Sequence, residues 1–484
     1  MYDQQWHELE KHVDELLEYE DRTLFSTWNL SLEQVEKQNA DAAKMLRLLA
    51  FFGNSGINFE LFRRTRDLTD DYKLDWLNTL TESKVVFNRA MAKLHDYSLV
   101  ERSLDGYSLH TCIHDWTLQN LNANIQPEYF WNALQCIATN VEREMEKNYW
   151  QNNQRLLPHA LRMEHRRFQF LFAEDLSEDR QADYLEQVGN LWDMQGMPQK
   201  AEFYVLRALK GRERLQGHDS MAVLNSISIL AYVSTSLGKF TQAEEMYKRV
   251  LAGYEKRDPN NERLLVLYHN LGNLHNRQGD YMAAEQMFLR ALEGDEDTKG
   301  PNAASTLITA NALAEVYTSQ KRFSEAEVMS QRALEGMKNV LGVAHPWTMT
   351  AVARRGLIHF DQKQWEQAER LWKQVLEDRK TFLGPNHHDT IRAASNLGFV
   401  YQKQLRLMEL LELVEIWGNK APDLFDRLHT LGLELLEQCD TEQAIITFQH
   451  ELNGREAVVG QNHVDTLEAA GSLGSLYRKC WEAQ

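Results

Sequence analysis

The chain lacks the short motifs on which nucleotide and hydrolase chemistry usually depends. Its 484 residues contain no GxxxxGK[ST] loop to cradle a triphosphate, no GxSxG nucleophile elbow and no HExxH zinc motif. Acidic pairs such as Glu244 and Glu245 fall on solvated helix faces by their spacing. The sequence therefore predicts a protein that is not an enzyme and that uses no cofactor.

Basic residues and long apolar runs are also scarce. The chain has 53 Lys and Arg against 71 Asp and Glu, a net charge of −18, which argues against nucleic acid and anionic membranes as ligands. The strongest apolar cluster, at residues 46–52, is far shorter than the roughly 20 residues that span a bilayer. Four widely spaced cysteines form no CxxC pair, and no signal peptide follows Met1, so we expect reduced thiols and a cytoplasmic protein.

What the chain has instead is a repeat of 42 residues. Small residues recur at this interval, with one step of 41 and one of 34, at Gly189, Ala231, Gly272, Ala314, Gly356, Gly398, Gly432 and Gly474. A second set keeps the same period at Ala201, Ala243, Ala284, Ala326 and Ala368, and then at Ala444. A period of this length predicts a solenoid, which usually offers a binding surface rather than an active site.

Each unit has the pattern of two amphipathic helices that approach closely at the small residues. We expect about seven helical pairs over residues 183–484, a final helix over Leu467–Lys479, and a right-handed superhelix. Gly279 is placed to end a first helix, whereas Lys321 and Lys363 stand where two other units need the turn glycine. The sixth unit is shortened around Leu405–Trp417, where we expect a distortion.

This pattern resembles the tetratricopeptide repeat in the long form found in kinesin light chains. Aromatic residues stand three positions after the small residue, at Trp192, Tyr317, Tyr401 and Tyr477, and open the second helices, at Phe240, Tyr281, Phe323 and Trp365. The connections at residues 341–348, 383–390 and 460–466, with their Gly, His and Thr residues, are similar to those of the same family. The resemblance covers residues 183–484 and implies an all-α solenoid.

The N-terminal 180 residues show no such repeat, and they predict short helices followed by a hairpin. Ser31 and Gln34 fit the ends of a capping box, and further helices are expected over residues 41–53, 59–64, 75–80 and 89–97. Two short runs around Asp105-Gly106 predict a hairpin over residues 99–110. Helices followed by a two-stranded wing indicate a winged-helix domain at residues 1–125, with bridging helices at 126–182 and the solenoid at 183–484.

Several stretches of this part resemble fungal NOD-like receptors, which are signal-transducing NTPases of the NB-ARC/NACHT type with tetratricopeptide sensors. They are residues 27–31, 42–52, 97–100, 109–116 and 156–160. That family carries a P-loop NTPase domain before the winged helix, and no such loop occurs in this sequence. The resemblance leaves two readings, the C-terminal part of a larger receptor or a truncated paralogue, and Met1 favours the second.

His110 is the residue that this resemblance singles out as a nucleotide sensor. In that family a His after the winged-helix hairpin touches the β-phosphate of ADP, and here Leu109-His110-Thr111 keeps the His but lacks the following Asp. We favour a structural histidine at a strand end. His110, Cys112 and His114 lie close in sequence, but zinc needs a fourth ligand that is not evident nearby, so no metal site is predicted.

The first helix of each repeat is expected to line a concave groove. Counted from the small residue, the groove positions are Asn225, His269, Asn273, Asn276, Arg277, Asn311, Glu315, Arg392 and Lys403. Asparagine amides both donate and accept, which suits binding of a peptide backbone, although solubility alone also selects polar residues on a helix face. We concentrate the predicted site on residues 225–320.

Two functions remain open. The first is a non-catalytic interaction scaffold or sensor that binds a protein or peptide ligand in the groove, with the acidic surface favouring a basic partner. The second is the regulatory and sensor part of a signal-transducing NTPase switch, an innate-immunity-like receptor whose NB-ARC/NACHT domain acts in trans or is missing from this chain.

Overall fold

The computed structural model describes residues 20–64, 75–122, 127–146, 148–164, 179–257 and 262–482, and this part of the chain is predominantly helical. The sequence also predicts a short charged helix over residues 1–20, and this stretch lies almost entirely outside the described ranges. Among the described helices, none is both long and apolar enough to cross a membrane. Contacts divide the chain into two compact units, residues 1–143, 152–191 and 200–226 in the first and residues 144–151, 192–199 and 227–484 in the second. The expected boundaries at residues 125 and 182 remain predictions.

The N-terminal part consists of short helices around one hairpin. Its elements are α2 (Glu20–Gln38), α3 (Ala40–Leu49), α4 (Glu60–Arg63), α5 (Asp75–Leu80), α6 (Lys84–Asp96), β1 (Glu101–Ser103), β2 (Gly106–Ser108), α7 (Thr111–Trp116), a π-helical turn (Thr117–Leu121), α8 (Pro127–Asn140) and α9 (Tyr149–Glu164). Strands β1 and β2 pair antiparallel, and an isolated bridge joins Ile57 to Tyr107. The predicted hairpin is thus present, and the two strands form the one sheet of the described residues.

One local prediction in this part is wrong. Ser31 does not cap a helix, because α2 runs without interruption through it to Gln38. The cap lies eight residues further on, where the Asn39 side chain accepts a hydrogen bond from the Ala42 amide at 3.0 Å and begins α3. Asn39 has the extended backbone of an N-cap, with φ −158° and ψ 91°. Ser31 instead lies in the interior of α2, where no helix begins.

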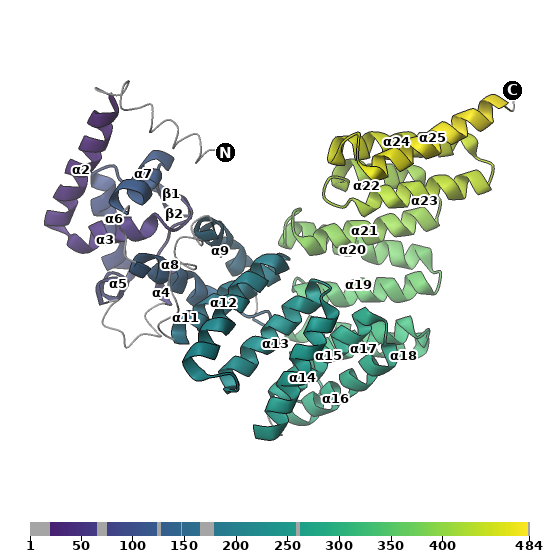
Figure 1. Ribbon diagram of the computed structural model, residues 1–484, viewed down its shortest axis with the longest axis horizontal. Helices are drawn as coiled ribbons and strands as arrows, with labels where there is room; N and C mark the ends of the chain where they lie inside the picture. Colours follow the sequence, from purple (N-terminus) through teal and green to yellow (C-terminus); the bar gives the residue numbers. More distant parts are fainter. Residues whose placement is uncertain are drawn as a thin grey trace. The chain divides into compact units, whose positions relative to one another are not determined.

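The described residues of the solenoid form seven helical pairs and a last helix, the number that the repeat predicts. They are α11 (Asp179–Met194) with α12 (Pro198–Gln216), α13 (Met221–Ser236) with α14 (Phe240–Arg257), α15 (Arg263–Gln278) with α16 (Tyr281–Lys299), α17 (Ala304–Ser319) with α18 (Phe323–Val340), α19 (Pro346–Asp361) with α20 (Trp365–Phe382), α21 (His388–Lys403) with α22 (Leu407–Trp417), α23 (Asp423–Glu437) with α24 (Thr441–Val459), and α25 (Val464–Glu482). In the second unit these helices follow one another as a stack of antiparallel pairs (Figure 1).

The small residues are where the two helices of a pair approach most closely. A Cβ atom on Gly272 would lie 2.7 Å from the Phe288 ring, and one on Gly356 would lie 2.7 Å from the indole nitrogen of Trp372. Ala284 and Phe288 are fully buried. Side chains this close cannot both be accommodated, so glycine in the first helix lets a large aromatic residue of the second helix pack against its backbone.

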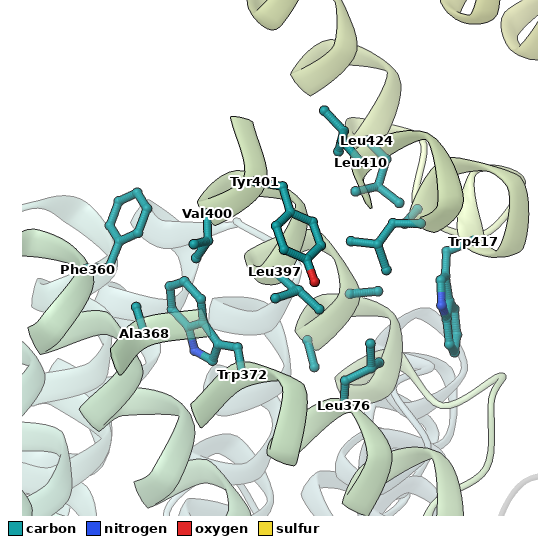
Figure 2. Close-up of a cluster of buried hydrophobic side chains, with 14 of the residues drawn as sticks. Phe360, Ala368, Trp372, Leu376, Leu397, Val400, Tyr401, Leu410, Trp417 and Leu424 are labelled. Atoms are coloured by element: carbon teal, nitrogen blue, oxygen red, sulfur yellow. The ribbon is translucent and has the colours of Figure 1, made fainter. Parts of the chain in front are cut away.

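The apolar core of the later repeats is continuous from one pair to the next. Figure 2 shows Phe360, Trp372 and Val400 packed together, with Tyr401, Leu410 and Trp417 continuing the cluster into the following pair. Trp372 also donates from its indole N–H to the Ala353 carbonyl at 2.9 Å, so this buried polar group is satisfied. Each pair therefore buries its apolar faces partly against its neighbours, as a solenoid requires.

Each of four turns inside the helical pairs contains one residue in the left-handed backbone conformation. Gly238 and Gly279 adopt it with φ of 75° and 80°, and Lys321 and Lys363 take the same conformation with φ of 63° and 61°. The turn geometry is thus retained without glycine. Beyond them, α22 has 11 residues where most second helices have 18 or 19, which is the shortening expected of the sixth unit.

Replacing Gly272 with Ala is predicted to destabilise the protein by about 1–3 kcal/mol, because the fully buried Phe288 cannot move aside. The matched control is Gly474→Ala. Gly474 stands at the same repeat position in α25, but its added Cβ meets nothing within 4 Å. The control should stabilise by about 0.5–1 kcal/mol through helix propensity alone. Urea unfolding of both variants checks this, and equal effects would contradict the close-approach role.

Lys363→Gly is predicted to raise the urea midpoint. A residue other than glycine in the left-handed conformation costs about 1–2 kcal/mol of folding free energy, which glycine avoids. Glycine is also more flexible in the unfolded chain, and this lowers the stability of the variant by about 0.5–1 kcal/mol. Lys363 is exposed, so little packing is lost. A net gain of about 0.5–1 kcal/mol is expected, and a lowered midpoint would show that this lysine stabilises the turn in another way.

Candidate functional site

Seven of the nine predicted groove residues lie on three first helices. Asn225 is on α13 within the first unit, whereas His269, Asn273, Asn276 and Arg277 are on α15 in the second. Asn311 and Glu315 follow on α17, also in the second unit. All of these residues except Asn225 therefore lie in the second unit.

Three of these residues link successive first helices to one another. His269 on α15 makes a 3.0 Å hydrogen bond between its Nδ1 atom and the Thr309 hydroxyl on α17. Asn276 donates to Glu315 at 3.1 Å, and the other carboxylate oxygen of Glu315 lies 2.8 Å from a guanidinium nitrogen of Arg354 on α19. Burial lowers the pKa of His269 to about 4, so it is neutral at pH 7. These polar groups are engaged in joining the repeats.

Asn311 is placed differently from the exposed amide that the sequence suggested. Its side chain is fully buried, and neither its amide nitrogen nor its carbonyl oxygen has a hydrogen-bond partner. Leaving a buried polar group unpaired costs about 1–3 kcal/mol. Asn311 lies beneath the surface of α17 and does not present its amide on that surface.

Asn273 and Arg277 retain free hydrogen-bonding capacity. They stand four residues apart on α15, so they share one face of the helix. Arg277 is exposed, and its one hydrogen bond among the described residues is a long contact of 3.5 Å to the Thr235 carbonyl. Asn273 is half-buried and makes no side-chain hydrogen bond in the described part of the chain.

Tyr232 is a site residue that the sequence reasoning missed. It follows Ala231 on α13 as Asn273 follows Gly272 on α15, so the repeat register could have found it. Its side chain remains 37% exposed. The pKa of Tyr232 is raised, chiefly because the surrounding protein removes water from the phenol. The carboxylates of Asp193 and Glu144 and the Tyr247 phenol raise this pKa further, whereas the positive charge of Arg277 lowers it. Glu144, Asp193, Tyr232 and Arg277 form what we call the Tyr232 cluster.

Both carboxylates of this cluster hold their protons unusually tightly. Burial raises the pKa of Asp193 to about 6, against the attraction of Arg277. Burial, helped by repulsion from Asp193 and Asp389, raises the pKa of Glu144 to about 7, while a hydrogen bond with Trp347 opposes the shift. The cluster therefore gains negative charge as the pH rises from about 5 to 8.

Two short segments bring the carboxylates to the repeats. In the first segment, residues 144–151, the rings of Tyr149 and Trp150 lie 5.6 and 5.4 Å from the ring of His345. In the second segment, residues 192–199, the Met194 carbonyl lies 3.2 Å from Nε2 of His387. His345 and His387 occur in successive inter-repeat connections, so these connections form the docking points for both segments.

His387, His388 and Asp389 are a group whose ligand atoms lie within 4.8 Å of one another. Both ring nitrogens of His387 are already in use: Nδ1 accepts from the Asp389 amide at 3.2 Å, and Nε2 contacts the Met194 carbonyl. The same capping bond recurs at His345, whose Nδ1 accepts from the Trp347 amide at 3.2 Å. The recurrence explains this histidine as a helix cap rather than as a metal ligand.

His110 has the same structural role in the first unit. Its Nδ1 accepts a hydrogen bond from the Cys112 amide at 3.3 Å and caps α7. His114 is buried and contacts the Phe52 carbonyl through Nε2 at 2.9 Å. Each histidine of the sequence triplet thus has a structural partner of its own, and the role of His110 toward a nucleotide remains a prediction.

The two remaining groove positions are paired with acidic residues. Arg392 lies 2.5 Å from a carboxylate oxygen of Asp389 on its own helix, α21. Lys403 at the end of α21 lies 3.0 Å from Glu434 on α23. Like His269 and Asn276, these side chains are already committed within the solenoid, which leaves the region of Tyr232, Asn273 and Arg277 as the open polar surface.

Comparison with protein families identifies the repeats. One tetratricopeptide repeat model matches residues 263–339 and 347–407, and a second matches residues 223–257. These stretches cover nearly all of α13 to α21, and they include Tyr232, Asn273 and Arg277 of the open polar surface. Comparison with curated proteins gives no significant match. The chain therefore contains tetratricopeptide repeats, as its 42-residue period predicts.

Several solved structures are similar to parts of the chain. BtubC (BKLC) from P. vanneervenii is 20% identical, with a TM-score of 0.35, and the match covers 49% of this chain and 92% of that one. A putative kinesin light chain of P. anserina with nearly identical TPR-like repeats is 16% identical, with a TM-score of 0.34 and coverage of 43% and 98%. A signal transduction ATPase (STAND) protein with a tetratricopeptide repeat sensor, PH0952 from Pyrococcus horikoshii, is 13% identical, with a TM-score of 0.39 and coverage of 88% and 64%.

Glu144→Gln is predicted to stabilise the protein at pH 8 and to have no effect near pH 4. The folded-state pKa of about 7 lies above the ordinary value of 4.5, so the folded protein binds this proton more tightly than the unfolded chain does. Ionising Glu144 therefore costs stability as the pH rises from about 4.5 to 7. We expect a gain of about 1–2 kcal/mol at pH 8, allowing for partial solvation.

The control for this prediction is Glu146→Gln, which changes an exposed carboxylate two residues away. Thermal unfolding of both variants from pH 4 to 8 checks the sign. A Glu144→Gln variant that is less stable than the wild type at pH 8 would show that the ionised carboxylate stabilises the fold.

Proposed function

We propose that the protein is a non-catalytic interaction scaffold whose tetratricopeptide repeats bind a protein or peptide ligand at the Tyr232, Asn273 and Arg277 surface. The observation that carries the proposal is the unused hydrogen-bonding capacity of Asn273 and Arg277, which stand beside His269 and Asn276, whose side chains are paired with the next repeat. An amide both donates to and accepts from a peptide backbone, and a guanidinium pairs with a carbonyl or carboxylate.

The surroundings favour a basic segment as the ligand. Asp193 and Glu144 lie close enough to Tyr232 to shift its pKa, and both carry negative charge above about pH 7. A net charge of −18 over the whole chain adds a long-range attraction for cations. A Lys or Arg side chain of the ligand would be attracted to the two carboxylates, while Asn273 and Arg277 would contact its backbone.

The test is a library of displayed peptides screened against the whole chain, followed by calorimetry with the selected peptides. Basic peptides should be enriched, and their affinity should rise between pH 5 and 8 as Asp193 and Glu144 ionise. The double substitution Asn273→Ala/Arg277→Ala should weaken binding by about ten-fold or more, because two direct contacts are lost.

Arg290→Ala is the matched control, because Arg290 is also exposed but lies on the second helix α16, where its guanidinium faces the Tyr268 ring at 5.8 Å. It should leave affinity unchanged. Enrichment of acidic peptides, or equal loss of affinity in the control and the double variant, would move the binding surface elsewhere.

A second candidate function follows from the N-terminal part of the chain. Strands β1 and β2, the bridge from Ile57 to Tyr107 and the packing of Tyr107 against Phe87 of α6 at 6.2 Å support a winged-helix-like arrangement. We propose as the alternative that this part regulates an NB-ARC/NACHT domain supplied in trans, with His110 as the residue that faces the nucleotide.

This alternative predicts that the chain alone hydrolyses neither ATP nor GTP, and that His110→Ala changes the nucleotide affinity of a complex with such a domain. Helix capping by His110 is retained in His110→Asn, since Asn is a good cap. If His110→Asn and His110→Ala both leave nucleotide binding unchanged, the residue is a cap and has no sensor role.

A further inference from the structure

Two short segments of the chain lie against repeats that are far from them in sequence. Residues 144–151 precede the solenoid, and residues 192–199 contain the turn between α11 and α12. Their contacts group both segments with the later repeats, in the second unit. We name these two segments together the brace.

One side of the brace is anchored on the connections that precede α19 and α21. A small apolar cluster lies there, made of Tyr149, Trp150, Met194, Ala344, Phe382 and Leu383. The Met194 carbonyl lies 3.2 Å from Nε2 of His387. A Cβ atom added to Gly196 would collide with the ring of His388, so the backbone of the brace passes directly beside this connection.

The other side of the brace faces α13 and α15. Asp193 lies close enough to Tyr232 and Arg277 for their charges to influence one another. Glu144 also influences Tyr232, and it makes a hydrogen bond with Trp347 of α19. The brace therefore joins the second and third helical pairs to the fifth and sixth.

These contacts are separate from the stacking of the repeats. In a solenoid each pair contacts only its neighbours, and the small rotation from pair to pair sets the curvature. A link between the second and fifth pairs adds a constraint on that curvature which stacking does not supply. Because the link uses its own small apolar cluster and not the continuous core, it can be lost while every pair keeps its neighbours.

We propose that the brace is a releasable link that sets the curvature of the second unit. Docked on the two connections, it holds α13 and α15 at a fixed separation from α19 and α21. Detached, it leaves the stack free to open along its first helices. The brace is present without any ligand, so this inference goes beyond the proposed function and does not rest on it, although Tyr232 and Arg277 belong to both.

Two carboxyl groups of the brace make the docked state depend on pH. Burial raises the pKa of Asp193 to about 6 and that of Glu144 to about 7, above their ordinary values of 3.8 and 4.5. The docked brace therefore binds these protons more tightly than the detached brace, in which both groups are solvated. Docking is strongest below the ordinary values, and it weakens as the pH rises through about 6 and 7.

The other groups around these carboxyls contribute little to this change. They are Tyr149, Tyr232, Arg277, His345 and Asp389, with His387, His388, Arg379 and Arg392 beside Asp389. Burial raises the pKa of both tyrosines and lowers that of the three histidines. Burial would also raise the pKa of Asp389, but Arg392 and Arg379 hold it well below its usual range, so its negative charge repels an ionised Glu144 at any pH from 5 to 8.

Hydrogen–deuterium exchange of the whole chain without ligand tests whether the brace acts as one link. His387→Asn removes the ring that contacts the Met194 carbonyl but retains the cap of α21, because Asn is a good cap. Exchange in residues 144–151 and 192–199 should rise together, by about five-fold or more. His463→Asn is the matched control, since His463 caps α25 in the same way, is 44% exposed and makes none of the brace contacts described above. It should leave exchange in both segments unchanged.

A second comparison tests the pH dependence. Corrected for the intrinsic chemical rate, exchange of the brace should rise by about ten-fold or more between pH 5 and 8. The double variant Glu144→Gln/Asp193→Asn should lose this dependence, because neither side chain then ionises. Glu146→Gln, which changes an exposed carboxylate of the same segment, should retain it.

The distance between the second and fifth pairs measures the opening directly. Spin labels attached at Glu245→Cys on α14 and Glu377→Cys on α20, both exposed positions, report it in a chain whose other accessible cysteines are replaced by Ser. The distance distribution should lengthen and broaden in His387→Asn and remain that of the wild type in His463→Asn.

Three results would each overturn the proposal. The first is exchange in His387→Asn that does not rise in both segments, and the second is a pH dependence that survives in the double variant. The third is an unchanged label distance in a variant whose brace has detached, which would show that stacking alone sets the curvature. None of these measurements uses a ligand, so their outcome is separate from that of the peptide-binding test.

Discussion

The close approach of two helices at one small residue is the constraint on which the solenoid depends. Gly272 and Gly356 let the rings of Phe288 and Trp372 pack directly on the backbone of the preceding helix. This contact sets the distance between the helices of a pair, and the buried alanines of the second helices allow the same approach from the other side. Because it recurs every 42 residues, successive first helices come to lie side by side, which makes contacts between residues about 40 positions apart possible.

Those contacts between first helices determine which polar residues are available to a ligand. Several polar groups that face the next repeat are already paired with it. His269 bonds to Thr309, and Asn276 bonds to Glu315, which in turn pairs with Arg354. Asn273 and Arg277 are left between these links. In such a scaffold, the polar residues that do not bond to the next repeat form the binding surface. The polar residues that do bond to the next repeat hold that surface in place.

The repeat itself could be predicted from the sequence, because helix pairs, turns and close contacts all depend on residues within one unit. Seven pairs and the hairpin near residue 105 were predicted in this way. The left-handed conformation that Lys321 and Lys363 adopt in place of the turn glycine was not predicted. The burial of Asn311, the pairing of Asn276 with Glu315 and the placement of Asp193 beside Tyr232 could not be predicted, because they depend on contacts between different repeats. Ser31 shows the same limit locally, since a capping pattern does not reveal whether the preceding residues are already helical.

As proposed above, a ligand binds across the first helices α13 and α15. Hydrogen–deuterium exchange of the whole chain, with and without a bound basic peptide, tests it most directly. Slowed exchange in residues 227–236 and 263–278, with little change in α14 and α16, is the predicted result. Protection confined to the second helices, or to the N-terminal part of the chain, would contradict the account.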